Sequence, residues 1–98
     1  MRAFGYDIPE DFLSEISGER AVDIHHITAR GKGSSKELDR IENLMALTRK
    51  EHEDYGDIRA FKSYLYRIHQ RQLELNGIDY DSNWINKQIQ KYEIYEND

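Results

Sequence analysis

Two short apolar runs, separated by a loop and followed by a helix-start signal, constrain the fold of this chain most. The first run, residues 21–24, alternates in the way that is typical of a half-buried strand. Residues 28–36 are rich in Gly, Ser and Lys, which is typical of a loop. The second run, residues 44–47, is short enough to be another strand. The pattern predicts a β-hairpin with a long loop.

The helix-start signal follows the second run directly. Thr48 and Glu51 fit a capping box, in which the Thr side chain accepts from the first turn and the Glu side chain reaches back to the cap. We therefore expect a helix to begin here and to end near residues 55–56. His52 lies in its first turn.

Three histidines and one asparagine mark this stretch. His25 and His26 follow the first run, and Asn43 precedes the second. The third histidine is His52. In this order and spacing, and with the phrases DIHHI, IENLMAL and HEDYGD around them, these residues resemble the HNH nucleases of the His-Me finger, or ββα-metal, superfamily. The small phage-type members are the most similar, and the resemblance covers the middle third of the chain.

The resemblance implies an α+β fold with a ββα-metal core at about residues 19–57. It also implies that His25 and His52 coordinate one divalent cation and that His26 is the general base. Neighbours in a regular strand face opposite ways, so we expect the strand to end or bend between the paired histidines. Asn43 would orient the base, hold the loop or give the cation an oxygen, and the sequence leaves these three roles open.

Two imidazole ligands leave positions for water and DNA phosphate, which a catalytic metal requires. The candidate cations are Mg²⁺, Mn²⁺, Ni²⁺ and Zn²⁺; imidazole suits the last three, whereas Mg²⁺ prefers oxygen ligands. The alternative is that the histidines are structural side chains, packed and hydrogen-bonded.

The chain departs from the family it resembles before the first strand and before the last histidine. Many phage-type members carry a Cys-x-x-Cys pair at each place and bind a structural zinc with them. This chain has no cysteine and places SEISG at 14–18 and TRKE at 48–51. Ser and Thr are not usual zinc ligands, so we expect no structural zinc. A helix over residues 7–18, with the capping box, is expected to fasten the core instead.

Charge distinguishes one segment from the rest. The 98 residues, expected to form a single domain (1–98), carry a net charge of −5, which is unfavourable for a protein that simply coats nucleic acid. Residues 20–36, however, hold four basic residues against one acidic residue. Because Arg30, Lys32 and Lys36 lie beside the histidines, we expect them to bind DNA phosphates. Taken alone, the same segment is a solvated surface loop.

The C-terminal part of the chain predicts two helices, giving a helical extension over residues 57–95. The first, 57–76, should be amphipathic and end at Gly77; the second should begin at Asp81 or Ser82. Together they would close as an antiparallel hairpin. His69 is isolated on the first helix and is assigned no role. The positions expected to be apolar stripes are Ile58, Phe61, Leu65, Ile68 and Leu75, then Ile85, Ile89 and Tyr92.

These features predict a metal-dependent endonuclease that nicks or cleaves DNA with low sequence specificity, since no base-reading module is recognisable. One alternative is a catalytically degenerate module of the same fold that binds DNA or a protein. Another is a helical interaction protein acting through residues 57–95. The sequence shows neither a secretory signal nor a membrane-spanning run, so a cytoplasmic monomer or weak homodimer is expected, in a host cytoplasm if the chain is phage-derived.

Overall fold

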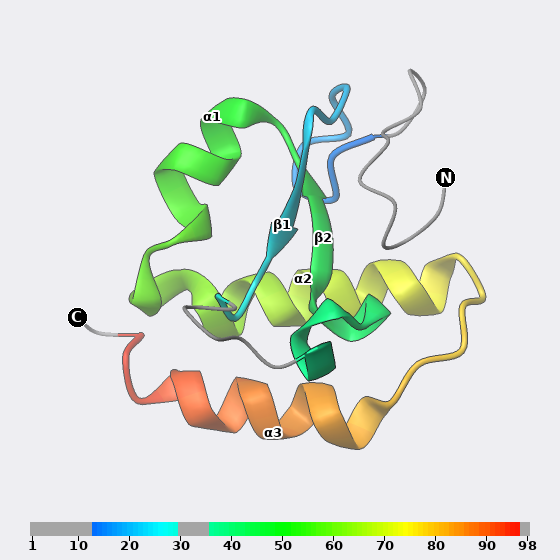
Figure 1. Cartoon of the computed structure of the whole chain (residues 1–98), viewed down its shortest axis with the longest axis vertical. Coiled ribbons are helices and arrows are strands. Elements are labelled where there is room, and N and C mark those ends of the chain that lie inside the picture. Colours follow the sequence, from blue (N-terminus) through cyan, green and yellow to red (C-terminus); the bar gives the residue numbers. More distant parts are fainter. Residues whose placement is uncertain (1–12, 30–35, 97–98) are drawn as a thin grey trace.

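The computed structural model describes residues 13–29 and 36–96, and their fold is of the mixed α+β class, as predicted. A π-helical turn, His52–Gly56, continues α1, and 3-10 turns lie at Lys36–Asp39, Ile41–Asn43 and Arg59–Phe61. The strands and helices are β1 (Asp23–His26), β2 (Leu44–Leu47), α1 (Arg49–Glu51), α2 (Lys62–Leu75) and α3 (Ser82–Glu93). Figure 1 shows the hairpin of β1 and β2 with α1 on one side, α2 crossing behind it and α3 antiparallel to α2.

The two strands form the predicted antiparallel hairpin, and β2 has the predicted bounds. Asp23 pairs with Leu47 and His26 with Leu44, so pairing is regular along the whole of β1. The expected end or bend between His25 and His26 is therefore wrong. Because the strand continues through both, their side chains leave from opposite faces of the hairpin.

The capping box at the start of α1 is confirmed. The Thr48 hydroxyl accepts from the backbone N–H of Glu51 at 3.1 Å, and the Glu51 carboxylate accepts from the backbone N–H of Thr48 at 2.9 Å. The α-helical turn then widens into the π-helical turn, which ends at Gly56 as expected. This places His52 at the junction of the two.

The helix predicted over residues 7–18 is wrong for its described part, and residues 7–12 lie outside the described ranges. Leu13 forms an isolated antiparallel bridge with Arg20, which folds the segment back on itself. The Ser14 hydroxyl accepts from the backbone N–H groups of Ile16 and Ser17, a local pattern that competes with helix formation. Gly18, with φ of 76°, allows the turn.

The helix α2 begins five residues later than predicted and buries a different face. Half of its six buried residues are polar or charged, whereas four of the five predicted stripe positions stay at least partly exposed. Gly77 ends the helix as predicted: with φ of 65° it lets the N–H of Ile78 reach the carbonyl of Leu73 at 3.0 Å. The buried residues are Lys62, Ser63, Leu65, Tyr66, His69 and Leu73.

The last helix, α3, begins where predicted, with the Asp81 carboxylate accepting from the N–H of Trp84. Ile85 and Tyr92 are buried and Ile89 packs against them, so the predicted stripe is confirmed as core. That core joins α3 to α2 and to the hairpin. Its buried members are Ile27, Met45, Leu47, Leu65, Tyr66, Leu73, Ile85 and Tyr92.

Candidate metal centre

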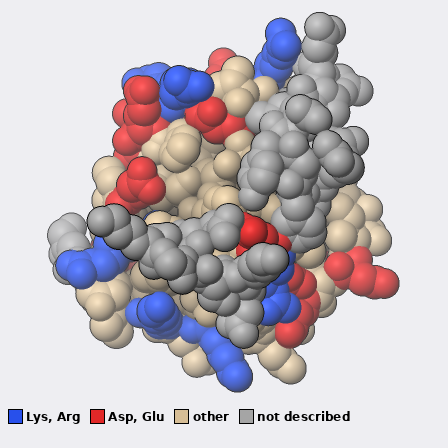
Figure 2. Space-filling model, in the orientation of Figure 1, with Lys and Arg blue, Asp and Glu red and all other residues tan. Residues whose placement is uncertain are grey.

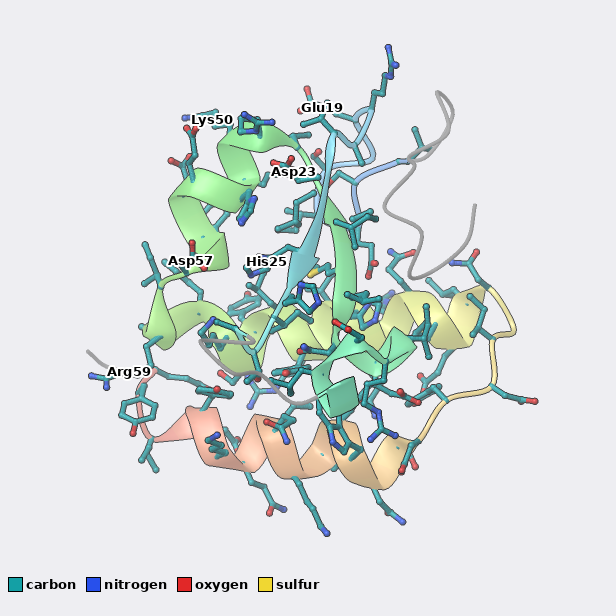
Figure 3. All side chains as sticks on the ribbon, in the orientation of Figure 1. Glu19, Asp23, His25, Lys50, Asp57 and Arg59 are labelled. Carbon is teal, nitrogen blue, oxygen red and sulfur yellow. The ribbon has the colours of Figure 1, made fainter. Side chains whose placement is uncertain are left out.

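The fold brings His25 of β1 and His52 of the π-helical turn together. Their ring centroids lie 4.6 Å apart with the ring planes tilted by 53°. Asp57, directly after the turn, completes a group in which one ligand atom from each residue lies within 4.8 Å of the others. Figure 3 shows His25 on β1 and Asp57 near the end of the neighbouring turn.

Sequence reasoning missed Asp57, and the π-helical turn explains why. In an α-helix the neighbours of His52 on one face are three and four residues away, and these are Tyr55 and Gly56. A π-helical turn closes from i to i+5, which matches the separation of His52 and Asp57. The sequence does offer Asp57 as a candidate ligand, at the end of the phrase HEDYGD. Its position on the same side of the turn as His52, however, depends on the wider π-helical turn.

His25 is buried and electrically neutral near neutral pH. Only 4% of its surface is exposed, and its Nε2 lies 2.7 Å from the carbonyl oxygen of Gly56. Burial, helped by the nearby His52 and Lys62, lowers the pKa of His25 to about 4. A neutral imidazole keeps a nitrogen lone pair, which is what a metal ligand needs.

His52 is half-buried and is oriented by Asp23 at the start of β1. Its Nδ1 lies 3.2 Å from Oδ2 of Asp23, and Arg49 donates to both oxygens of the same carboxylate, at 2.9 and 3.3 Å. Burial alone would raise the pKa of Asp23, but the hydrogen bonds from Arg49 and His52 outweigh it and lower that pKa. Asp23 is therefore an ionised acceptor at neutral pH.

A hollow of about 310 Å³ opens in front of His52. It is lined by three carboxylates, one imidazole and one guanidinium, from Asp23, Glu53, Asp57, His52 and Arg49. This excess of negative charge favours a cation and opposes an unaccompanied phosphate. In Figure 2 acidic and basic side chains lie together over the α1 part of the molecule, whereas basic ones mark the lower edge, along α3.

The donor set fits a divalent cation of the transition series. Imidazole nitrogen and carboxylate oxygen are ligands of Zn²⁺, Mn²⁺ and Ni²⁺, and two imidazoles with one carboxylate are a known catalytic zinc set. His25 and His52 were predicted as ligands and Asp57 was not. Three protein ligands would leave at least one position of a bound cation open to water or substrate.

His26, the predicted general base, contacts a different partner. Its Nε2 lies 2.8 Å from Oδ1 of Asp39, which follows the 28–36 loop, and both side chains are about one-fifth exposed. It is not a member of the ligand group formed by His25, His52 and Asp57. The structure therefore brings two of the three predicted histidines together and pairs the other with a carboxylate.

Asn43 is fully buried, and its carboxamide is saturated with hydrogen bonds. Its Nδ2 donates to the carbonyls of Thr28 and Leu38, while its Oδ1 accepts from the N–H of Thr28 and the hydroxyl of Tyr66, all between 2.7 and 3.0 Å. These contacts join the two ends of the 28–36 loop. Of the three roles left open, they support holding the loop.

The predicted phosphate-binding residues lie mostly beyond the described ranges. Arg30 and Lys32 fall outside them, and the backbone of Lys36 begins a 3-10 turn.

Comparisons with protein-family models, with curated proteins and with solved structures find no match to this chain. Among the described residues, no helix is long and apolar enough to cross a lipid bilayer.

Proposed function

We propose that the protein is a divalent-metal-dependent DNA endonuclease of the HNH type, built on a ββα-metal core. The observation that carries the proposal is the meeting of His25, His52 and Asp57, two of which the resemblance had already designated as ligands. The order of hairpin and helix, with the histidine pair on β1 and the third histidine after the capping box, also agrees with it.

The proposed chemistry assigns a role to each group. When bound, a divalent cation polarises a phosphoryl oxygen and stabilises the departing oxygen. His25, His52 and Asp57 would hold that cation, and His52 and Asp57 also line the acidic hollow. His26 would take the proton of the attacking water, with Asp39 orienting its ring and stabilising the imidazolium that forms, as carboxylates do for catalytic histidines elsewhere.

A plasmid-nicking assay tests the proposal. We expect nicking with Mn²⁺, Ni²⁺, Zn²⁺ or Mg²⁺ and none with EDTA. His26→Ala should abolish nicking and leave metal binding intact, whereas His25→Ala and Asp57→Asn should weaken metal binding as measured by calorimetry. Asn86→Ala, at an exposed position of α3, is the matched control and should cut normally. If all of these variants nick the plasmid equally well at every metal concentration, the group formed by His25, His52 and Asp57 is not the active site.

DNA binding itself has a separate test on the 28–36 loop. Replacing Arg30 and Lys32 with Ala should weaken binding and flatten its dependence on salt, because each phosphate contact releases counterions. An unchanged salt slope would remove the loop from the DNA interface.

One observation favours a second candidate, a non-enzymatic module of the same fold. The hollow is acidic, and Nε2 of His26 is engaged with Asp39 rather than left open. Such a module would bind DNA or a protein without cutting. The nicking assay distinguishes the two, because DNA retained in a binding assay but never cut with any metal indicates the module.

A further inference from the structure

Lys62 is a buried lysine beside the candidate metal centre, and sequence reasoning gave it no role. From the start of α2, its Nζ donates to the carbonyl of Ile27 at 2.5 Å and to the carbonyl of Gly56 at 3.3 Å. An ammonium group has donors only, so a buried one must be surrounded by acceptors. Ile27 follows His25 by two residues, and the Gly56 carbonyl contacts the His25 ring. Lys62 therefore fixes the backbone on both sides of that ring.

The Gly56 carbonyl determines which nitrogen of His25 carries the proton. A carbonyl oxygen can only accept, and Nε2 of His25 lies 2.7 Å from it, so Nε2 is the protonated nitrogen. A neutral imidazole has one N–H and one lone pair. The lone pair of His25 is consequently on Nδ1.

The close approach of the rings to Gly56 depends on its missing side chain. A Cβ at this position would lie 2.7 Å from Cδ2 of His52 and 3.1 Å from Cε1 of His25. Both rings therefore pack against the bare backbone of the turn. This contact, with the ammonium of Lys62 on the same carbonyl, leaves His25 little freedom to turn its ring.

Asp23 selects the opposite tautomer at His52. Both oxygens of its carboxylate accept from Arg49, so the carboxylate faces His52 as an acceptor, and Nδ1 of His52 lies 3.2 Å from its Oδ2. Nδ1 of His52 is therefore protonated, and the lone pair is on Nε2. Histidine ligands of metals usually donate their second ring N–H to a carboxylate or a carbonyl in this manner.

We propose that Lys62 and Asp23 are positioning residues that hold His25 and His52 in opposite tautomers, so that Nδ1 of His25 and Nε2 of His52 are the nitrogens that bind a divalent cation. This inference rests on the proposed metal centre, but the tautomers exist before metal arrives. They can be measured in the metal-free protein, independently of any nuclease activity.

Long-range ¹H–¹⁵N NMR of the metal-free protein near neutral pH reports each tautomer directly. We expect His25 to show the Nε2–H pattern and His52 the Nδ1–H pattern. Adding Zn²⁺ should then shift Nδ1 of His25 and Nε2 of His52. The reverse tautomer at either ring, or shifts confined to the protonated nitrogens, would overturn the proposal.

Four variants separate positioning from general stability. Lys62→Met keeps the length of the side chain and removes its donors, and Asp23→Ala removes the acceptor. Each should convert the affected ring to a mixture of tautomers and weaken Zn²⁺ binding about 10- to 100-fold. Asp23→Asn retains an acceptor oxygen and should rescue the His52 tautomer. Lys50→Met removes an exposed lysine of the same region, paired with Asp54, and should change neither property.

The outcomes are distinguishable from those of the nuclease assay. The expected tautomers, lost only in Lys62→Met and Asp23→Ala, support the inference even in a protein that never cuts DNA. If Lys62→Met does not fold, the wild-type spectrum and the comparison of Asp23→Ala with Asp23→Asn still test the proposal. Unchanged tautomers in Asp23→Ala, or no response of either ring to Zn²⁺, would overturn it.

Discussion

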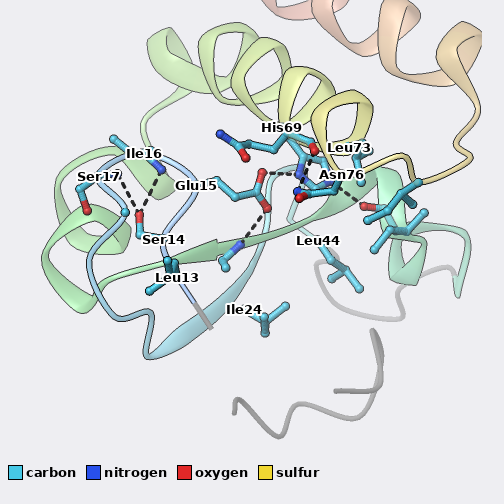
Figure 4. Close-up of a pocket in the computed structure, with 15 residues that line it drawn as sticks. Leu13, Ser14, Glu15, Ile16, Ser17, Ile24, Leu44, His69, Leu73 and Asn76 are labelled. Atoms are coloured by element: carbon cyan, nitrogen blue, oxygen red, sulfur yellow. Dashed lines mark hydrogen bonds and ion pairs between the residues drawn. The ribbon is translucent and has the colours of Figure 1, made fainter. Parts of the chain in front are cut away.

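Two buried histidines of this protein differ in charge, because their surroundings favour the neutral ring at His25 and the protonated ring at His69. Burial, with the nearby His52 and Lys62, favours the neutral ring of His25 and outweighs the hydrogen bond to the Gly56 carbonyl, which favours the charged one. His69 lies between two acceptors, with Nδ1 at 2.6 Å from Glu15 and Nε2 at 2.7 Å from the carbonyl of Ile41. Both nitrogens of His69 face acceptors, which favours the doubly protonated imidazolium. Figure 4 shows the Glu15 side chain directed at the His69 ring.

The His69 imidazolium should make stability fall at alkaline pH. Burial opposes the charged form, but Glu15 and the Ile41 carbonyl outweigh it and raise the pKa of His69 above that of an unfolded histidine. Its stabilisation is therefore complete below the unfolded pKa and is lost as pH rises through the folded one. Urea midpoints measured from about pH 6 to about pH 9 should decline.

Glu15→Gln is the matched variant for His69. It keeps an acceptor and removes the negative charge, so the folded pKa of His69 should fall towards that of an unfolded histidine. The alkaline decline should then be smaller and be complete at lower pH, and the protein should be less stable near neutrality. A wild-type stability that is flat over the alkaline range, or a Glu15→Gln profile that coincides with it, would contradict the buried ion pair.

The buried His25 should make stability fall at acidic pH, which is the opposite of the effect of His69. Its folded pKa of about 4 lies below the usual 6.5, so the unfolded state binds more protons between these values and stability falls as pH falls across that window. The loss attributable to His25 is on the order of 3 kcal/mol. Denaturation of His25→Gln should show a shallower acid slope; an equal slope would mean that other groups cause it.

Gly56→Ala should disturb the metal centre without straining the backbone, because no positive φ is present there. The added Cβ would overlap His52 and crowd His25, so we expect a loss of about 1 to 3 kcal/mol and weaker Zn²⁺ binding. Gly77→Ala is the control: it has φ of 65° and open space, so it should lose about 1 kcal/mol and bind Zn²⁺ normally. Equal Zn²⁺ affinities in both would contradict the packing argument.

At the scale of elements, a polar cluster joins the 14–18 turn to the start of α1. The hydroxyl of Ser14, 4% exposed, donates to Oε1 of Glu51 at 2.5 Å, and that oxygen also accepts from the backbone N–H of Thr48. Burial alone would raise the pKa of Glu51, but hydrogen bonds from Ser14, the Thr48 backbone and Ser17 outweigh it and lower that pKa. The cluster occupies the positions where the resembled family carries its two cysteine pairs. Here, hydrogen bonds fasten the two segments.

Removing one member of this cluster should loosen both elements. Ser14→Ala leaves the buried Glu51 carboxylate without that donor, so we expect a loss of about 1 to 3 kcal/mol in urea denaturation. Thr48→Ala should cost about 1 kcal/mol through the lost cap, whereas Thr48→Ser keeps the hydroxyl and should be nearly neutral. If Ser14→Ala proves as stable as Thr48→Ser, the cluster does not fasten the core.

The elements that the sequence predicted well are those with local signals. The Thr48 capping box, the Gly77 end of α2 and the alternation of the hairpin each depend on neighbouring residues. The 7–18 helix failed in its described part because Ser14 bonds its own turn and the distant Glu51, which no local pattern reports. The buried face of α2 was missed because His69 and Lys62 are buried through hydrogen bonds rather than apolarity.

The residues of the candidate site also differ in whether the sequence alone could place them. The His25–His52 contact was predictable because a resemblance related the two positions. Asp57 and Lys62 were not, since one depends on a π-helical turn and the other on a buried ammonium reaching two carbonyls across elements. The placement of His26 beside Asp39 likewise depends on the 3-10 turn Lys36–Asp39, which no local pattern in the sequence relates to β1.

For the molecule as a whole, the net charge and the acidic hollow determine how a cation would affect stability if it binds at the candidate site. The chain carries a net charge of −5, and three carboxylates line the hollow in front of His52. A cation that binds only the folded state stabilises it by RT ln(1 + [L]/Kd), about 2.7 kcal/mol when the free cation is 100-fold above Kd. For a chain of this size, each kcal/mol raises Tm by roughly 4 to 8 °C.

Thermal unfolding with and without Zn²⁺ or Mn²⁺ therefore tests the metal centre without any DNA. We expect the cation to raise Tm by about 10 to 20 °C at saturation and EDTA to reverse the rise. Asp57→Asn removes a charged ligand at an exposed position, so it should fold normally and show a much smaller rise. Asn86→Ala should respond as the wild type does. A rise of the same size in Asp57→Asn would place the stabilising cation elsewhere on this acidic protein.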